Sequence, residues 1–306
     1  MKILFLHISD LHMKSDNRKN SKEIQHKVDK VVSAVKSLGM VDKYVVICSG
    51  DLTYSGLVDE YKSVRKVMRS LLPQIGKINT PSQYVEFYLV PGNHDMVLND
   101  SSRKFADIEA FFKDKREDEE FEKELTFQKH FFEYAKSNKC FTRNQVVHSI
   151  VKDYNGFRVQ YNLINTAPFS TLKPDDKQLH YLPDSHLYSV LRQDNINLSI
   201  SIMHHSTEWF CNRTKESLED TIKNNVGIAP YEISSIPHLL QIALFGMRWT
   251  RTSTCFCIHI HTKKLSKTAL LYLTNSNPIN RHIRQRNRPI RDNLLRSAAY
   301  VHQHVG

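Results

Sequence analysis

The sequence lacks any long apolar run: none approaches the roughly 18–20 residues that a membrane-spanning helix requires. The first apolar stretch, residues 3–8, is too short for the core of a signal peptide, and no small-residue cleavage site follows it. Only five of the 306 residues are cysteines, and they do not form the paired framework of a disulfide-rich secreted protein. We therefore expect a cytoplasmic protein with no membrane segment.

Acidic residues are scarce at one end of the chain. Residues 247–306 hold eleven Lys or Arg and a single acid, Asp292, so that +10 of the net charge of +11 lies there. The same segment has one glycine and six arginines between positions 281 and 296. A basic tail of this kind can bind nucleic acid. The abrupt change in composition also suggests a second hypothesis, a frameshift just after Gly246.

The first half of the chain alternates apolar runs with amphipathic patterns. Three apolar runs predict buried strands: residues 3–8, 44–48 and 84–90. Between them, apolar side chains at helical spacing predict two helices: residues 24–38, ended by Gly39, and residues 61–72, ended by Pro73. The order strand, helix, strand, helix, strand favours parallel crossovers, in which sites form at the carboxyl ends of the strands.

The second half of the domain is mostly strands. Residues 104–138 have helical patterns and a mixed-charge run typical of a solvated face, and we treat residues 101–140 as a helical, charged insertion. Alternating apolar and polar side chains then predict three strands: residues 157–165, 197–203 and 239–245. We therefore expect an α/β fold with two packed sheets flanked by helices over residues 1–246, followed by the anomalous tail.

Polar side chains of a few kinds follow four of these strands. They are Asp10 and His12, Asp51, the run Asn93-His94-Asp95, and the pair His204-His205. Asp10-x-His12, Gly50-Asp51 and His204-His205 each have an ordinary structural explanation when taken alone, whereas the ligand density of Gly92-Asn93-His94-Asp95 rarely serves packing. Together they place carboxylate, amide and imidazole donors at one sheet edge, and this mixture suits Mn, Fe, Zn or Mg. A carboxylate shared by two ions is a common arrangement for phosphoryl transfer.

In these clusters the sequence resembles the calcineurin-like metallophosphoesterases. The resemblance spans about residues 1–246 and covers four of the five family motifs: Asp10-x-His12, Gly50-Asp51, Gly92-Asn93-His94-Asp95 and His204-His205. It implies a four-layer α/β/β/α sandwich of two mixed sheets. It also implies a phosphoesterase that hydrolyses phosphate mono- or diesters with a hydroxide activated by two divalent metal ions. The substrate would be a phosphorylated small molecule or a nucleotide.

The resemblance assigns metal ligands. Asp10 and His12 would bind the first ion, and Asp51 would bridge both ions. Asn93 and His204 would bind the second.

The resemblance also implies two catalytic residues. His94, held by Asp95, would be the general acid and would contact the phosphate. His205 would replace His204 as a ligand of the second metal ion if the register of the motif were shifted by one residue.

The fifth motif of the family, Gly-His-x-His after a strand, is missing. Residues 239–246 resemble that strand and its glycine, but Met247 follows where a histidine would stand. The frameshift hypothesis accounts for this break. Alternatively, His259 and His261 form a His-x-His pair that could supply the missing ligands from a longer loop.

Two other functions are compatible with the sequence. The chain could be a non-catalytic binding module that keeps the phosphoesterase fold, or a nuclease whose basic tail holds nucleic acid. Metal content separates the first alternative from an enzyme, since an enzyme should retain about two ions per chain and a scaffold none or one.

Overall fold

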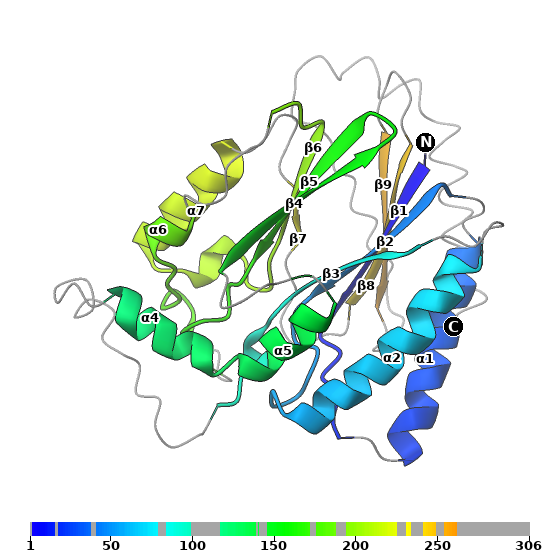
Figure 1. The fold of residues 1–306 in the computed structure, drawn as a ribbon, viewed down its shortest axis with the longest axis horizontal. Helices are drawn as coiled ribbons and strands as arrows, with labels where there is room; N and C mark the ends of the chain where they lie inside the picture. The colour runs from blue at the N-terminus through cyan, green and yellow to red at the C-terminus, as the bar shows by residue number, and fades with distance from the viewer. Residues whose placement is uncertain are drawn as a thin grey trace.

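The chain folds into two β-sheets with helices beside them (Figure 1). The strand order is β3-β2-β1-β8-β9 in the first sheet and β4-β5-β6-β7 in the second. This computed structural model describes residues 2–15, 18–37, 41–78, 84–98, 117–138, 140, 146–171, 176–187, 194–224, 231–233, 241–248 and 254–261.

The first sheet combines three parallel strands with an antiparallel pair. The parallel strands are β1 (Lys2–Ser9), β2 (Lys43–Ser49) and β3 (Glu86–Val90). Their apolar runs are buried almost throughout, as expected for strands covered on both faces. Next to β1 lies β8 (Gln241–Arg248), which runs antiparallel to it and pairs in turn with β9 (Thr254–His261).

Strand β9 belongs to the segment that the sequence analysis separates as a basic tail. Its pairing with β8 makes it part of the first sheet. The remainder of the tail, residues 249–253 and 262–306, lies outside the described residues, as do most of the arginines on which the nucleic-acid prediction depends.

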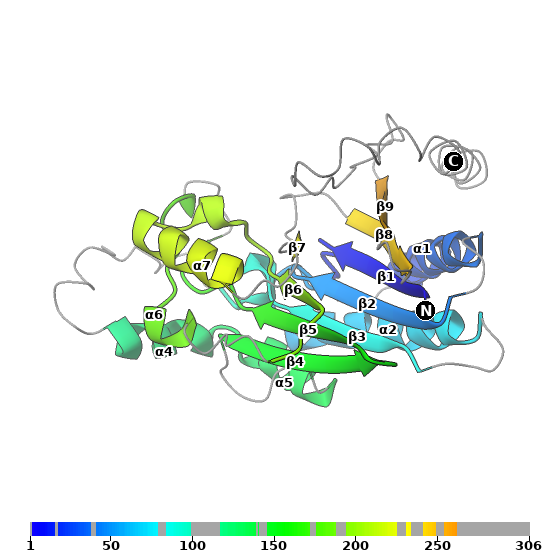
Figure 2. The same cartoon turned by 90° about the horizontal axis from the view of Figure 1, so that it is seen from above.

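Helices α1 (Arg18–Ser37) and α2 (Val58–Gly76) lie side by side along the first sheet (Figures 1 and 2). Their apolar stripes are buried, which confirms the predicted helical periodicity. The prediction that Pro73 ends the second helix is wrong, because α2 continues to Gly76. Proline lacks an N–H, but this position is in the last turn, which the Lys77 amide closes on the Pro73 carbonyl (3.2 Å).

The second sheet contains β4 (Val147–Tyr154), β5 (Phe157–Ile164), β6 (Leu198–Ile202) and β7 (Tyr231–Ile233). Strands β5, β6 and β7 are parallel, and β4 pairs antiparallel with β5. The sequence analysis missed β4, although Asn155-Gly156 is a strong hairpin signal. Both residues adopt positive φ, 56° and 84°, as a two-residue hairpin turn requires.

The remaining helices lie mainly beside the second sheet (Figures 1 and 2). They are α4 (Glu117–Thr126), α5 (Lys129–Ser137), α6 (Asp184–Leu187), α7 (Asn212–Asn224) and the 3₁₀ helices η1 (Asn93–Asp95) and η3 (Thr207–Trp209). The predicted helical insertion is described from residue 117 onward, where it forms two helices. No helix within the described residues has the length and apolar character needed to cross a bilayer.

The two sheets meet through aromatic side chains. The ring of Tyr161 on β5 lies 4.4 Å from that of Tyr88 on β3 and 6.5 Å from that of Phe5 on β1, measured between centroids. The Tyr154 hydroxyl donates to a carboxylate oxygen of Glu86 at 2.6 Å, which joins β4 to β3. The predicted α/β fold of two sheets flanked by helices is therefore confirmed.

Candidate metal centre

The candidate site lies where the parallel strands of the first sheet end. The loops that follow β1 and β2 are joined by main-chain hydrogen bonds. The Asp10 amide donates to the Gly50 carbonyl at 3.2 Å, and the His12 amide donates to the Asp51 carbonyl at 3.0 Å. Two loops that are 40 residues apart in sequence therefore present their side chains at one edge of the sheet.

Three of the candidate ligands have a left-handed backbone conformation. The φ angle is 55° at Asp10, 44° at His12 and 52° at Asp51. A residue with a side chain adopts this region at a cost of about 1 kcal/mol or more. Strain of this kind is concentrated at functional sites, where the surrounding structure holds it in place. Its presence at three neighbouring polar residues therefore points to a function rather than to packing.

Glycine is required at two positions where the strand ends meet. Gly50 has a φ of 100°, and a Cβ atom there would lie 2.5 Å from Nδ1 of His204. A Cβ atom on Gly92 would overlap the Asp51 carboxylate. The absence of both side chains lets the end of β6 approach the loops that follow β2 and β3.

The side chains form two donor sets that share Asp51. In the first set, His12 Nε2 lies 3.8 Å from Asp10 Oδ1 and 3.6 Å from Asp51 Oδ2. In the second, His204 Nε2 lies 3.5 Å from Asp51 Oδ1 and 3.2 Å from Asn93 Oδ1. Donor atoms at these separations can share a cation at about 2.0–2.2 Å from each. The predicted ligands Asp10, His12, Asp51, Asn93 and His204 therefore lie close together. The donor atoms can also be grouped in another way, because atoms of His12, Asp51 and His94 lie within 4.8 Å of one another, as do atoms of Asp10, Asp51 and His204.

Hydrogen bonds orient the lone pairs of the second set. His204 donates from Nδ1 to the Ser49 carbonyl at 2.8 Å, so its Nε2 carries a lone pair. The Asn93 amide nitrogen donates to the Thr171 carbonyl at 2.9 Å, which turns its Oδ1 toward His204. Burial lowers the pKa of His204, which favours the neutral imidazole that binds metals. Three acceptor atoms, the third from Asp51, therefore face one another with no proton between them, and a cation would relieve their repulsion.

The first set contains the buried carboxylate of Asp10. Asp10 is 2% exposed, and neither of its oxygens accepts a hydrogen bond of good geometry within the described residues. Burial raises the pKa of Asp10 to about 6, although His204 and Ser9 act in the opposite direction. A buried charge with few hydrogen bonds is costly, and a divalent ion would reduce that cost. The residues of both sets therefore fit metal ions, and their oxygen and imidazole donors fit Mn, Fe, Zn or Mg.

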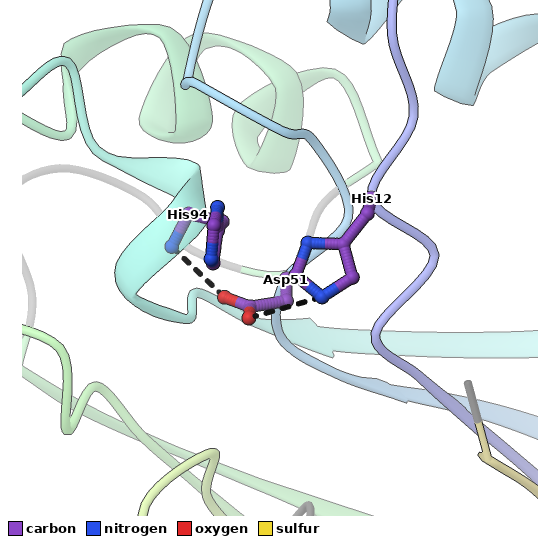
Figure 3. A group of neighbouring side chains, drawn as sticks. All are labelled: His12, Asp51 and His94. Carbon is purple, nitrogen blue, oxygen red and sulfur yellow. Dashed lines mark hydrogen bonds and ion pairs between the residues drawn. The ribbon is translucent and has the colours of Figure 1, made fainter. Parts of the chain in front are cut away.

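His94 lies beside Asp51 and His12 (Figure 3). Its ring centroid is 4.4 Å from that of His12 in an edge-to-face arrangement, and its main-chain amide donates to Asp51 Oδ1 at 2.9 Å. The ring donates from Nδ1 to the Tyr54 carbonyl at 2.8 Å. Its Nε2 is therefore the nitrogen that can exchange a proton with a ligand at this site.

Asp95 does not hold the His94 ring as the sequence analysis predicts. Its fully buried carboxylate accepts hydrogen bonds from the amides of Thr53 (3.0 Å) and Leu52 (3.2 Å), and the Tyr61 hydroxyl donates to it at 3.1 Å. Burial raises the pKa of Asp95 despite the amide donors. In this structure Asp95 connects the loop after β2 to η1. The Tyr54 carbonyl, and not Asp95, accepts the hydrogen bond that orients the His94 ring.

Only the first histidine of the pair after β6 joins the site. His205 donates from Nδ1 to the Thr166 carbonyl at 3.1 Å, and its ring lies 4.4 Å from that of His180. Burial lowers the pKa of His205 well below its usual value. The geometry therefore favours His204 over the alternative register.

Comparisons with known proteins identify the family. The family model of the calcineurin-like phosphoesterases matches residues 3–229, most of the chain. The chain belongs to this family. Among solved structures, GAP50, the anchor in the inner membrane complex of Plasmodium, is 10% identical, with 90% of each chain covered and a TM-score of 0.45. Purple acid phosphatase PPD1 from yellow lupin (Lupinus luteus) seeds is 13% identical, with a TM-score of 0.42, 79% of this chain covered and 39% of that chain. No curated protein sequence matches significantly.

The strand expected to carry the fifth motif of this phosphoesterase family runs away from the site. Because β8 is antiparallel to β1, Gly246 pairs with Leu4, far from the carboxyl end of β1. The opposite end of β8, at Gln241, pairs with Ser9 on one side and with His261 on the other. The backbone register thus brings the C-terminal end of β9 next to the C-terminal end of β1, where the site lies. The residues that follow Gly246 lie next to the N-terminal end of β1.

The sequence analysis missed a buried network that lies behind the second donor set. The Thr171 amide donates to Asp176 Oδ2 at 2.6 Å, and His180 Nε2 lies 3.1 Å from the same oxygen. Asp176 is 1% exposed, and Thr171 is the residue whose carbonyl orients Asn93. Asp176 therefore fixes the segment that aims the Asn93 oxygen, and no spacing in the sequence links the two.

Proposed function

We propose that this chain is a metal-dependent phosphoesterase that hydrolyses phosphate mono- or diesters. The observation that carries the proposal is the position of Asp51, whose two carboxylate oxygens face two separate donor sets. A shared carboxylate suits two ions that act on one phosphoryl group. Membership of the calcineurin-like phosphoesterase family supports the same class of reaction.

The donor sets and His94 have different roles in the proposed reaction. Two divalent ions held by the two donor sets would act as Lewis acids, neutralising the phosphoryl oxygens and making water more acidic. His94 is placed to give a proton from Nε2 to the leaving oxygen, since its Nδ1 is engaged with the Tyr54 carbonyl. The fixed ring orientation means that proton transfer needs no rotation of His94.

The test is hydrolysis of aryl phosphate mono- and diesters with and without Mn²⁺, together with metal content per chain. Activity should require the metal. Asp51→Asn should lose both activity and metal, and His94→Ala should lose activity while it retains metal. Asp59→Asn, which alters an exposed carboxylate on α2, is the control and should behave as wild type.

Either of two outcomes would contradict the proposal. One is full activity in Asp51→Asn. The other is a folded wild-type chain that retains one ion or none and hydrolyses neither ester, which would favour the non-catalytic binding module.

A further inference from the structure

Exposed large apolar side chains occur in the segment that begins at Tyr54, whose ring lies beside that of His94. Among the residues that the structure describes, four large apolar side chains are exposed, and three of them belong to residues 54–58, the loop before α2 and the first residue of that helix. These are Tyr54, Leu57 and Val58, each 44–47% exposed. Exposed apolar side chains scattered singly are ordinary, but a group of them beside a polar site is typical of a binding surface.

The loop that carries these side chains is held in place by hydrogen bonds. The Glu60 carboxylate accepts from the main-chain amides of Ser55 (2.8 Å) and Leu57 (3.2 Å). His130 on α5 donates to the Gly56 carbonyl at 2.9 Å. The apolar surface is therefore pre-organised, and a ligand would not have to order it on binding.

The apolar surface continues directly into the site. The Tyr54 carbonyl orients His94, and the two rings lie 5.7 Å apart between centroids at an angle of 40°. The His12 ring lies 6.4 Å from the Tyr54 ring. Under the proposed function, His94 protonates the leaving oxygen, so the rest of the leaving group lies on the His94 side of the phosphate. Among the exposed large apolar side chains of the described residues, Tyr54 is the one whose ring contacts that of His94.

A cation lies over the same aromatic ring. The exposed Lys14 places its Nζ 4.1 Å from the Tyr54 ring centroid, a cation–π contact. This contact helps to fix the ring and places a positive charge beside it. A ring that is both half-exposed and close to a cation suits a flat aromatic group attached to a phosphate better than an alkyl chain, which would need neither feature.

We propose that Tyr54, Leu57, Val58 and Lys14 form a subsite for the leaving group of the substrate, and that this group carries an aromatic ring such as a nucleobase. The proposal rests on the proposed function for the position of the leaving group. It narrows the substrate class to nucleotide-like phosphoesters.

A matched pair of substrates tests the subsite in the full chain. Adenosine 5′-monophosphate and ribose 5-phosphate release the same kind of primary alkoxide and differ only in the base. Stacking of a base on an aromatic side chain corresponds to a preference of about tenfold or more. Wild type should therefore favour the nucleotide in kcat/KM by about that factor, and Tyr54→Ala should bring the ratio close to one.

Tyr84→Ala provides the control. Tyr84 is 78% exposed but precedes β3, at the opposite edge of the first sheet from the site. This variant should keep the wild-type ratio. No preference in wild type, or a preference that survives Tyr54→Ala, would overturn the subsite.

A second measurement decides the matter without activity. Saturation-transfer NMR with adenosine on the metal-free full chain should show transfer to the adenine protons in wild type and Tyr84→Ala, and much weaker transfer in Tyr54→Ala. Equal transfer in all three proteins would refute the subsite. Adenine transfer that depends on Tyr54 in a chain that hydrolyses no ester would support the subsite and refute the proposed function.

Discussion

Replacing Asp10 by asparagine should have opposite effects on the metal-free and the metal-loaded protein. The carboxylate is buried, and neither oxygen has a hydrogen bond of good geometry within the described residues. Burial raises the pKa of Asp10 from 3.8 to about 6 in the metal-free protein. About two pKa units at about 1.4 kcal/mol each give an upper bound of about 3 kcal/mol for the cost of the charge at neutral pH. Asparagine has nearly the same shape and carries no charge.

We therefore expect Asp10→Asn to stabilise the metal-free protein by about 2–3 kcal/mol, or about 4–8 °C in Tm. Because the folded-state pKa of Asp10 is raised, its favourable contribution is complete below pH 3.8 and is lost as the pH rises through about 6. The stability difference between variant and wild type should accordingly grow between pH 4 and 6 and stay constant above pH 7.

Metal should reverse the order of stability. A ligand at a thousand times its Kd stabilises a protein by about 4.1 kcal/mol, which exceeds the advantage of about 2–3 kcal/mol expected for the metal-free variant. Wild type should gain such an increment with Mn²⁺, and Asp10→Asn, which lacks one charged ligand, should gain little.

Thermal unfolding followed by circular dichroism at pH 5 and pH 7.5, with EDTA or with excess Mn²⁺, measures all four conditions. Asp59→Asn is again the control for loss of a carboxylate. A metal-free Asp10→Asn protein that is less stable than wild type at pH 7.5 would refute the reasoning. Asp10 would then have to be stabilised by interactions other than a cation.

Three further substitutions test the supports of the site. Gly92→Ala should destabilise the fold by about 1–3 kcal/mol and weaken Mn²⁺ binding, because its Cβ would overlap the shared carboxylate; urea unfolding and calorimetry measure the two effects. Asp176→Ala should weaken Mn²⁺ binding about tenfold through Asn93, and Asp176→Asn, which keeps an oxygen acceptor, should recover most of the loss; equal affinity in wild type and Asp176→Ala would contradict this. If the end of β9 completes the site, His261→Ala should lower metal content per chain more than His259→Ala does, and equal content in both would exclude that role.

The ligands that the sequence analysis found share one property. Asp10, Asp51 and Asn93 each follow an apolar run that is long enough to be a buried strand, and the parallel order of the strands brings their ends to one edge. Asp176 has no such marker. It follows no predicted strand, and only its hydrogen bond with Thr171 in the folded chain links it to Asn93.

The predicted contact between His94 and Asp95 fails for a local geometric reason. His94 and Asp95 are neighbours in sequence, but both belong to the 3₁₀ helix η1, where successive side chains point about 120° apart. Asp95 consequently points into the core, where the amides of Leu52 and Thr53 satisfy it. His94 points outward to the site and is oriented by a carbonyl, a partner that no side-chain pattern can reveal.

The direction of β8 decides whether a fifth motif after Gly246 could reach the site. The apolar run before Gly246 predicts a strand but says nothing about whether it runs parallel or antiparallel to its neighbours. In this structure Met247 pairs with Ile3, six residues from Ser9 along β1, or about 20 Å at the rise of a strand. A histidine at position 247 would lie at the wrong edge of this sheet, so restoring it could not complete the two donor sets in this arrangement. The frameshift hypothesis therefore requires β8 to be paired differently in an intact chain, whereas the alternative through His261 requires only the register already present.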